Sequence, residues 1–166
     1  MRIRFISVIL SLTFLCTACG FQLRKDADLP SQMAKTQIVM ADEYSALGRR
    51  VRVLLEQSGV EFVGGNEATA ILEIPVNSVV TEVLTIGNNA RVREYRISHT
   101  VRFRLLDANG QDILSWQDLR QAREISFDEQ KILAASREQE YLKDDLADTL
   151  SRILVTRLES APANSG

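Results

Sequence analysis

The most regular pattern in the chain is the alternation in REYRISHTVRFRL, residues 93–105. Its odd-numbered positions are mostly apolar: Arg93, Tyr95, Ile97, His99, Val101, Phe103 and Leu105. Its even-numbered positions are charged or polar: Glu94, Arg96, Ser98, Thr100, Arg102 and Arg104. Successive side chains of a β-strand point to opposite faces, so this segment predicts a strand with one face on a core. The other face is expected to be wet and basic.

Turn signals on both sides of this strand predict hairpins. Gly87-Asn88-Asn89 tolerates the backbone angles of a tight turn, and Asn109-Gly110 is a strong hairpin signal. Residues 70–86 upstream and 112–125 downstream are rich in β-forming residues, so we expect three antiparallel strands in sequence order. Pro75 has no amide donor, and the strand that contains it is therefore expected to lie at an edge or to carry a bulge there.

The rest of the body reads as one short strand and two helices. Residues 37–40 predict the strand, and residues 43–57, with Asp42 as N-cap, predict the first helix. The second helix follows the last strand and reaches Leu158, with a loosening expected in the highly charged segment 136–140. The predicted fold class is α+β: a two-layer sandwich with two helices packed on one face of a mostly antiparallel four-stranded sheet.

The first twenty residues carry a targeting signal. Arg2 and Arg4 precede an uncharged, largely apolar run of 11 residues, Phe5–Leu15. This run is too short to cross a membrane as a helix, which takes about 20 residues, but it suits a secretory signal. It ends on small residues before Cys19, which resembles the lipobox of bacterial lipoproteins. That resemblance implies cleavage before Cys19, which then carries an S-diacylglycerol and an N-acyl chain.

An ordinary secretory signal is the alternative, and it would leave Cys19 as a free or disulfide-bonded thiol. In lipoproteins of this type an aspartate after the cysteine commonly signals inner-membrane retention, so Gly20 favours the outer membrane, with the domain facing the periplasm. Several acyl chains together give durable anchoring. The predicted division is a signal peptide at 1–18, a lipidated tether at 19–36, the α+β domain at 37–159 and a disordered tail at 160–166.

Composition excludes several classes of function. The formal net charge of −2 argues against a general nucleic-acid binder. One histidine and two cysteines are too few for a metal cluster or Cys–His catalysis, and no phosphate-cradling glycine loop occurs. His99 lies on the apolar face of its strand and is expected to be a buried, hydrogen-bonded core residue. We therefore expect no enzyme activity and no cofactor beyond the covalent lipid on Cys19.

The arginines on the predicted sheet are the remaining candidates for binding. Arg91, Arg93, Arg96, Arg102 and Arg104 follow one another along a single strand. Guanidinium groups suit phosphates because they donate paired, charge-assisted hydrogen bonds. Exposed strands also carry long charged side chains simply to prevent edge-to-edge association. The residues alone leave both interpretations open.

Several stretches together resemble the LPS-assembly lipoprotein family, LptE. They are CGFQLR at 19–24, ALGRRVRVLL at 46–55 continuing into SGVE at 58–61, ARVREYR at 90–96, and SFD at 126–128 leading to LAA at 133–135 and EQE at 138–140. Their order and spacing extend the resemblance over most of the chain that follows the signal.

This resemblance implies a partner, a ligand and a location. LptE proteins plug the outer-membrane β-barrel LptD one-to-one, assist its assembly, and contact lipopolysaccharide (LPS) during its insertion into the outer leaflet. Their basic residues lie near the hairpin tip and before the last helix, which here implies LPS binding by Arg91, Arg93, Arg96 and Arg137. Arg137 stands where the family pattern has a lysine. The alternative is a periplasm-facing outer-membrane lipoprotein tether or lipid-binding module unrelated to LPS export.

Overall fold

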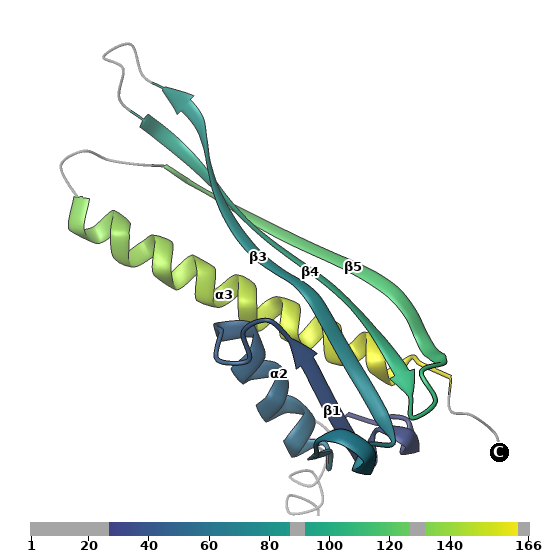
Figure 1. Ribbon diagram of the computed structural model, residues 1–166. Coiled ribbons are helices and arrows are strands. Elements are labelled where there is room, and N and C mark those ends of the chain that lie inside the picture. The colour runs from purple at the N-terminus through teal and green to yellow at the C-terminus, as the bar shows by residue number, and fades with distance from the viewer. Residues whose placement is uncertain (1–26, 87–91, 127–131, 163–166) are drawn as a thin grey trace, which may run out of the picture.

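The computed structural model describes residues 27–86, 92–126 and 132–162 (Figure 1). Its helices are the short 3-10 helices η2 (Ser31–Ala34) and η3 (Gly65–Glu67) and the α-helices α2 (Ala46–Gln57) and α3 (Ile132–Glu159). Its strands are β1 (Lys35–Met40), β2 (Glu61–Phe62), β3 (Ala70–Ile86), β4 (Val92–Asp107) and β5 (Asp112–Ser126). The predicted lipidation site, Cys19, and the predicted hairpin tip, residues 87–89, lie outside the described residues.

The sheet has five strands in the order β2-β1-β3-β4-β5 and is mixed. The last three strands are antiparallel neighbours, as predicted, whereas β1 runs parallel to both β2 and β3. The predicted four-stranded sheet is therefore wrong by one strand. β2 contributes only the pairs Lys35↔Glu61 and Thr36↔Phe62, which is too short a segment to show an alternating pattern.

Both long helices pack on the same face of this sheet, which confirms the two-layer arrangement (Figure 1). The core combines Leu72, Ile74, Val101, Phe103 and Leu105 from the sheet, Leu47, Val51 and Leu55 from α2, and Leu150, Leu154 and Leu158 from α3. The odd positions of β4 from Ile97 to Leu105, His99 included, are buried, as the alternation predicted. We call the opposite side of β3, β4 and β5 the open face.

Both predictions for Pro75 are confirmed: β3 has a bulge at this residue, and beyond it β3 is an edge strand. Before it, Leu72 pairs with Leu105; after it, Val76 pairs with Arg102, and the register has shifted by one residue. The extra residue changes which positions of β3 face the helices, from Leu72 and Ile74 before the bulge to Asn77 after it. Pairing with β1 also ends at Ile74, so the rest of β3 is an edge strand.

The two helices differ from the prediction in detail. α2 begins at Ala46, three residues later than the predicted 43, because Ser45 rather than Asp42 is the N-cap and accepts a hydrogen bond from the amide of Gly48. α3 continues through residues 136–140 without the predicted loosening. Arginine, glutamate and glutamine are good helix formers, so a charged segment at the surface needs no break.

The folded body extends beyond the predicted boundaries of 37 and 159. Met33 is fully buried in the core, and β1 begins at Lys35, so the predicted tether of residues 19–36 overlaps the body. Ala161, expected in the tail, is also buried against the core. Met33 and Ala161 both pack against the hydrophobic core, and burying apolar surface is more favourable than extending it into solvent.

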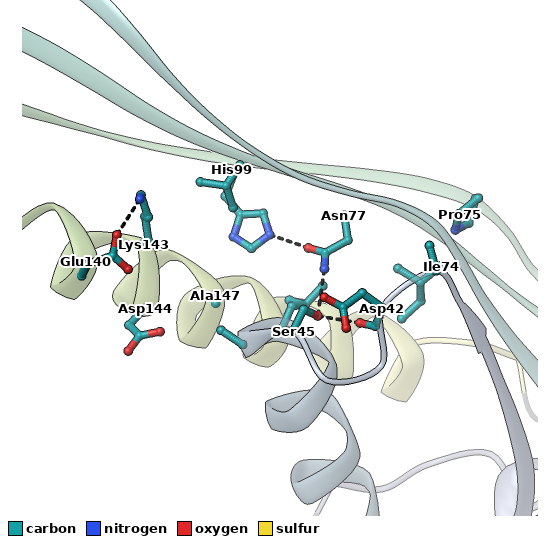
Figure 2. A pocket seen from close by; sticks show the side chains of 14 residues that line it. Asp42, Ser45, Ile74, Pro75, Asn77, His99, Glu140, Lys143, Asp144 and Ala147 are labelled. Carbon is teal, nitrogen blue, oxygen red and sulfur yellow. Dashed lines mark hydrogen bonds and ion pairs between the residues drawn. The ribbon is translucent and has the colours of Figure 1, made fainter.

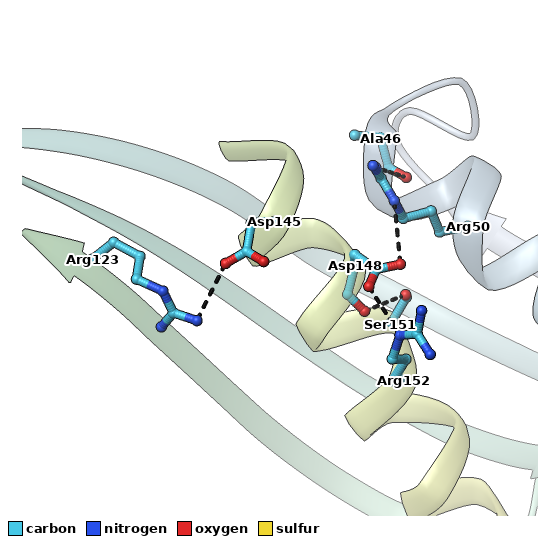
Figure 3. Close-up of polar contacts among 7 residues, drawn as sticks. All are labelled: Ala46, Arg50, Arg123, Asp145, Asp148, Ser151 and Arg152. Atoms are coloured by element: carbon cyan, nitrogen blue, oxygen red, sulfur yellow. Dashed lines mark hydrogen bonds and ion pairs between the residues drawn. The ribbon is translucent and has the colours of Figure 1, made fainter. Parts of the chain in front are cut away.

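Ion pairs join the helix layer internally and to the sheet (Figure 3). Arg50 of α2 lies 3.7 Å from the carboxylates of both Asp144 and Asp148 of α3. Arg123 of β5 lies 3.2 Å from Asp145. These groups are partly exposed, so we expect each pair to contribute at most about 1 kcal/mol. Arg50 thus links the two helices to each other, and Arg123 links α3 to the sheet.

The predicted Asn-Gly hairpin between β4 and β5 is confirmed. Gly110 has a φ of 79°, which suits glycine. The carboxylate of Asp107 accepts hydrogen bonds from the amides of Gln111 and Asn109, each at 2.8 Å. These hydrogen bonds, the one from Gln111 first, lower the pKa of Asp107 below its ordinary value because they favour the charged form.

Candidate functional site

The open face carries arginines that are matched by carboxylates on neighbouring strands. Arg104 of β4 lies 2.7 Å from Glu73 of β3. Arg96 lies 2.7 Å from Glu124 of β5, and its guanidinium donates two hydrogen bonds to the same oxygen. The predicted basic face is therefore charge-balanced over much of its length. The register between strands places each carboxylate opposite its arginine, so these ion pairs cannot be predicted from the sequence of one strand.

Trp116 of β5 lies among the arginines of this face. The guanidinium carbons of Arg102 and Arg104 lie 4.9 Å and 4.5 Å from the centre of its ring. Arg102 also approaches Asp118 at 3.8 Å. Contacts of this kind are worth about 0.5–1 kcal/mol at exposed sites. This cluster fixes the orientation of its side chains and leaves a polar surface.

Arg120 is the exception on the open face. It pairs across the strands with Thr100 and donates a hydrogen bond of 3.3 Å to the hydroxyl of Ser98. Among the residues that the structure describes, no carboxylate lies within ion-pair distance of it. Its charge is therefore available to an anionic group of a ligand or partner.

The outer part of β3 exposes apolar side chains on both of its faces. We call residues 76–86 of β3 and the paired residues 92–102 of β4 the outer ribbon. Its exposed apolar side chains, with their exposed fractions, are Val76 at 37%, Val79 at 43%, Val80 at 48%, Val83 at 50% and Leu84 at 39%. The free backbone edge of β3 lies beside them. Such an edge is a template for association, so this surface fits contact with a partner.

The sequence contained a signal for this surface that its interpretation missed. Val79-Val80 and Val83-Leu84 are adjacent apolar pairs. Because neighbouring strand residues point to opposite faces, each pair places one apolar side chain on each face. A strand with only one buried face alternates instead, as β4 does.

The four predicted LPS-binding arginines are not brought together by the described structure. Arg96 is ion-paired on the open face, and Arg137 is exposed on α3, in the layer that covers the opposite face. Arg93 is part of β4, and Arg91 lies outside the described residues. Their common role stays a prediction.

The described residues contain no helix that is both long and apolar enough to span a membrane. They also contain no group of three or more His, Cys, Asp or Glu side chains placed to hold a metal ion.

Comparison with known proteins identifies the family. The sequence model of the family described as "LptE: Lipopolysaccharide-assembly" matches residues 33–158. The chain belongs to the LptE family. Among curated LptE relatives, the LPS-assembly lipoprotein of Photorhabdus laumondii is 27% identical over 162 residues, which cover 95% of this chain and 87% of the relative. That of Yersinia pestis strain Pestoides F is 29% identical over 161 residues, which cover 95% of this chain and 77% of the relative.

Solved structures of two lipoproteins share the LptE-like fold of this chain. Lipoprotein B of Nitrosomonas europaea is 25% identical, with a TM-score of 0.69 over 85% of this chain and 91% of the other. The rare lipoprotein B of Shewanella oneidensis is 24% identical, with a TM-score of 0.65 over 76% of this chain and 94% of the other.

Proposed function

We propose that this LptE-family protein is an outer-membrane lipoprotein subunit of the LPS translocon. In this role it plugs the LptD barrel one-to-one, assists its assembly and contacts LPS during insertion into the outer leaflet. The match of the family model to residues 33–158 carries the proposal, because it covers the two-layer body from Met33, the first residue of its hydrophobic core, to the last turn of α3.

The surfaces of the domain suit a position inside a barrel. The lumen of an outer-membrane barrel is polar and wet, so its occupant needs a polar surface without a large excess of one charge. The ion-paired open face has this character. The outer ribbon adds exposed valines and a free strand edge, which gain stability when a partner covers them.

The proposed role is non-catalytic. The protein would act by filling space, by holding its partner during assembly and by contacting LPS. Its membrane attachment is proposed to be the covalent lipid on Cys19, with the domain on the periplasmic side and within the barrel.

Co-purification tests the proposed partner. The full chain, with an affinity tag, is expected to retain a large outer-membrane β-barrel in mild detergent at about one-to-one. Recovery of the lipoprotein alone would contradict the proposal and favour a tether or lipid-binding module unrelated to LPS export. If the outer ribbon is the contact, Val80→Lys lowers barrel recovery. Val39→Lys on β1 is the matched control, because Val39 is 45% exposed and Val80 is 48% exposed.

LPS capture tests the proposed ligand contact. The double substitution Arg91→Glu and Arg93→Glu is expected to reduce capture of LPS by the purified complex, because it repels phosphates near the hairpin. The control reverses the same number of charges at Arg152 and Arg157 near the end of α3, away from the hairpin. Equal capture by both double variants would move the contact away from β4.

A further inference from the structure

A pocket of about 390 Å³, with both polar and apolar lining, lies on the helix-covered side, where the start of α2, the bulge of β3 and the middle of α3 meet (Figure 2). It is distinct from the open face and from the predicted LPS-binding arginines. Its volume is sufficient for the end of a long side chain, and several of its lining groups are hydrogen-bond acceptors.

A directed chain of hydrogen bonds runs along the wall of this pocket. The hydroxyl of Ser45 donates to the carbonyl of Asp42 at 2.8 Å, and its oxygen accepts from the amide of Gly48 at 3.1 Å. Since the single hydroxyl proton is used, the Asn77 group 3.0 Å away must be the NH2. The amide oxygen of Asn77 therefore faces Nε2 of His99, at 2.7 Å.

This direction decides the state of the imidazole. Nε2 must carry the proton that it donates to Asn77, so in the neutral ring Nδ1 has a lone pair and no hydrogen. Burial lowers the pKa of His99 below its ordinary value, which favours the neutral ring. Nδ1 of His99 can therefore only accept a hydrogen bond.

Nδ1 is buried and has no hydrogen-bond partner within the described residues, and His99 as a whole is only 2% exposed. Figure 2 shows this side of the ring turned away from Asn77, toward α3 and the pocket. A buried acceptor without a donor is costly, because it has given up its hydrogen bonds to water and gained none in return. The pocket thus lacks one N–H or O–H group at a defined place.

The charges around the pocket favour a cation. Asp42, Glu140 and Asp144 line it, whereas Lys143 is the only lysine or arginine that does so among the residues described. Lys143 is held 2.7 Å from Glu140, and Asp144 is only loosely paired, at 3.7 Å, with Arg50. An anion would meet repulsion here, and a neutral hydroxyl would leave Asp42 without a cationic partner among the described residues.

We propose that this pocket binds the ammonium or guanidinium group of a lysine or arginine side chain from a partner polypeptide. One N–H of that group donates to Nδ1 of His99, and its charge faces Asp42 and Asp144. The pocket shares Asn77, Val79 and His99 with the outer ribbon but lies on the helix-covered side, and its occupancy is measured without any barrel or LPS. Failure of one proposal therefore leaves the other standing.

The experiment uses His99 as its own reporter, because it is the only histidine in the chain. The full chain, carrying a tag free of histidine, is labelled with isotopic histidine and studied in detergent by imidazole nitrogen NMR. The cationic probes are n-butylammonium and ethylguanidinium, the end groups of lysine and arginine. The controls are n-butanol, which donates but is neutral, and tetramethylammonium, which is charged but has no N–H.

At least one cationic probe is expected to shift the Nδ1 signal saturably while the Nε2 signal changes little. A short peptide with one lysine or arginine is expected to act in the same way. Butanol and tetramethylammonium are expected to have little effect. The proposal is overturned if neither cationic probe moves Nδ1, if butanol acts equally, or if the probes bind and the peptides do not. If the Nδ1 chemical shift is already that of a hydrogen-bonded nitrogen and no probe changes it, water occupies the site. This result also overturns the proposal.

Substitutions on the pocket wall sharpen the test. Asp42→Asn keeps an oxygen for its contact with the amide of Tyr44 but removes the charge, and it is expected to weaken binding of the cationic probe by about twofold to fivefold. Glu138→Gln, on the same helix as Glu140 but outside the pocket lining, is the matched control and is expected to change nothing.

Lys143 provides a separate check, because its ammonium is the pocket's own cation. Lys143→Gln is expected to strengthen probe binding, since it removes a like charge. If this substitution alone shifts Nδ1 before any probe is added, Lys143 already donates to His99 in solution, and the proposed external cation is wrong.

Discussion

The two parts of β3 on either side of Pro75 have opposite environments. Residues 70–74 pair with strands on both sides, and Ala70, Leu72 and Ile74 are almost completely buried. Residues 76–86 pair with β4 alone, and their valines are between 37% and 50% exposed. Aliphatic residues make up four of the five positions in 70–74 and six of the eleven in 76–86, so both parts are typical of a strand and strand propensity does not separate their environments. The first part therefore stabilises the domain, whereas the second leaves apolar surface exposed.

The largest expected difference is in the free energy of unfolding, when one apolar side chain is truncated in the first part and one in the second. Leu72→Ala removes a fully buried side chain and is expected to lower the free energy of unfolding by about 2–5 kcal/mol. Val80→Ala removes a side chain that is 48% exposed and is expected to change it by less than about 0.5 kcal/mol. Urea unfolding of the purified protein measures both. A large loss from Val80→Ala would show that the outer ribbon is part of the folding core.

A smaller effect is expected from the ion pairs at the two ends of β4. Arg104 and Glu73 lie 2.7 Å apart with side chains 29% and 28% exposed. Arg96 and Glu124 are equally close but 40% and 62% exposed. Double-mutant cycles to alanine are expected to give a coupling free energy of about 1 kcal/mol for the first pair and about 0.3 kcal/mol for the second. Equal couplings would contradict the difference in environment.

The smallest effect concerns pH and the second part of β3, where Val79 pairs with His99 of β4. Burial lowers the pKa of His99 in the folded state, so the unfolded chain binds more protons as the pH falls. Stability is therefore expected to be full above about pH 7.5 and to decline as the pH falls through the ordinary histidine pKa of about 6.5. Urea midpoints between about pH 7.5 and 5.5 measure this decline.

The control is His99→Gln, which removes the titrating ring. The carboxylates of Asp42, Glu140 and Asp144 and the ammonium of Lys143, which share the pocket, remain in this variant. The decline in urea midpoint is expected to disappear even if the variant is less stable throughout. The same decline in wild type and variant would assign the pH dependence to other groups.

Patterns within single segments predicted the helix layer, the three long strands and the buried face of β4. They failed where the answer depends on a neighbouring segment. The parallel pairing of β1 and the two-residue β2 leave no periodic signature of their own. The charged segment 136–140 predicted a break, yet its residues are good helix formers on a solvent-exposed surface.

The candidate site shows the same limit. The sequence located the arginines of β4 but not their partners, because Glu73 and Glu124 reach them only through a register that contains bulges. It placed His99 in the core correctly. It did not reveal the unpartnered Nδ1, which depends on Ser45 and Asn77 from two other elements. The pattern within one strand predicted which face each side chain occupies. It did not predict the contacts that these side chains make with other strands and helices.

The bulge at Pro75 also constrains how this strand can vary in length. Because it adds one residue, residues 76–83 alternate between the two faces of the sheet in the opposite order to residues 70–74. Deleting Pro75 would exchange the sides of the distal half, turning Asn77 away from His99 and directing Val80 toward the helices. At the far tip, in contrast, residues inserted in pairs on each arm would lengthen the hairpin and leave the phase of the body untouched.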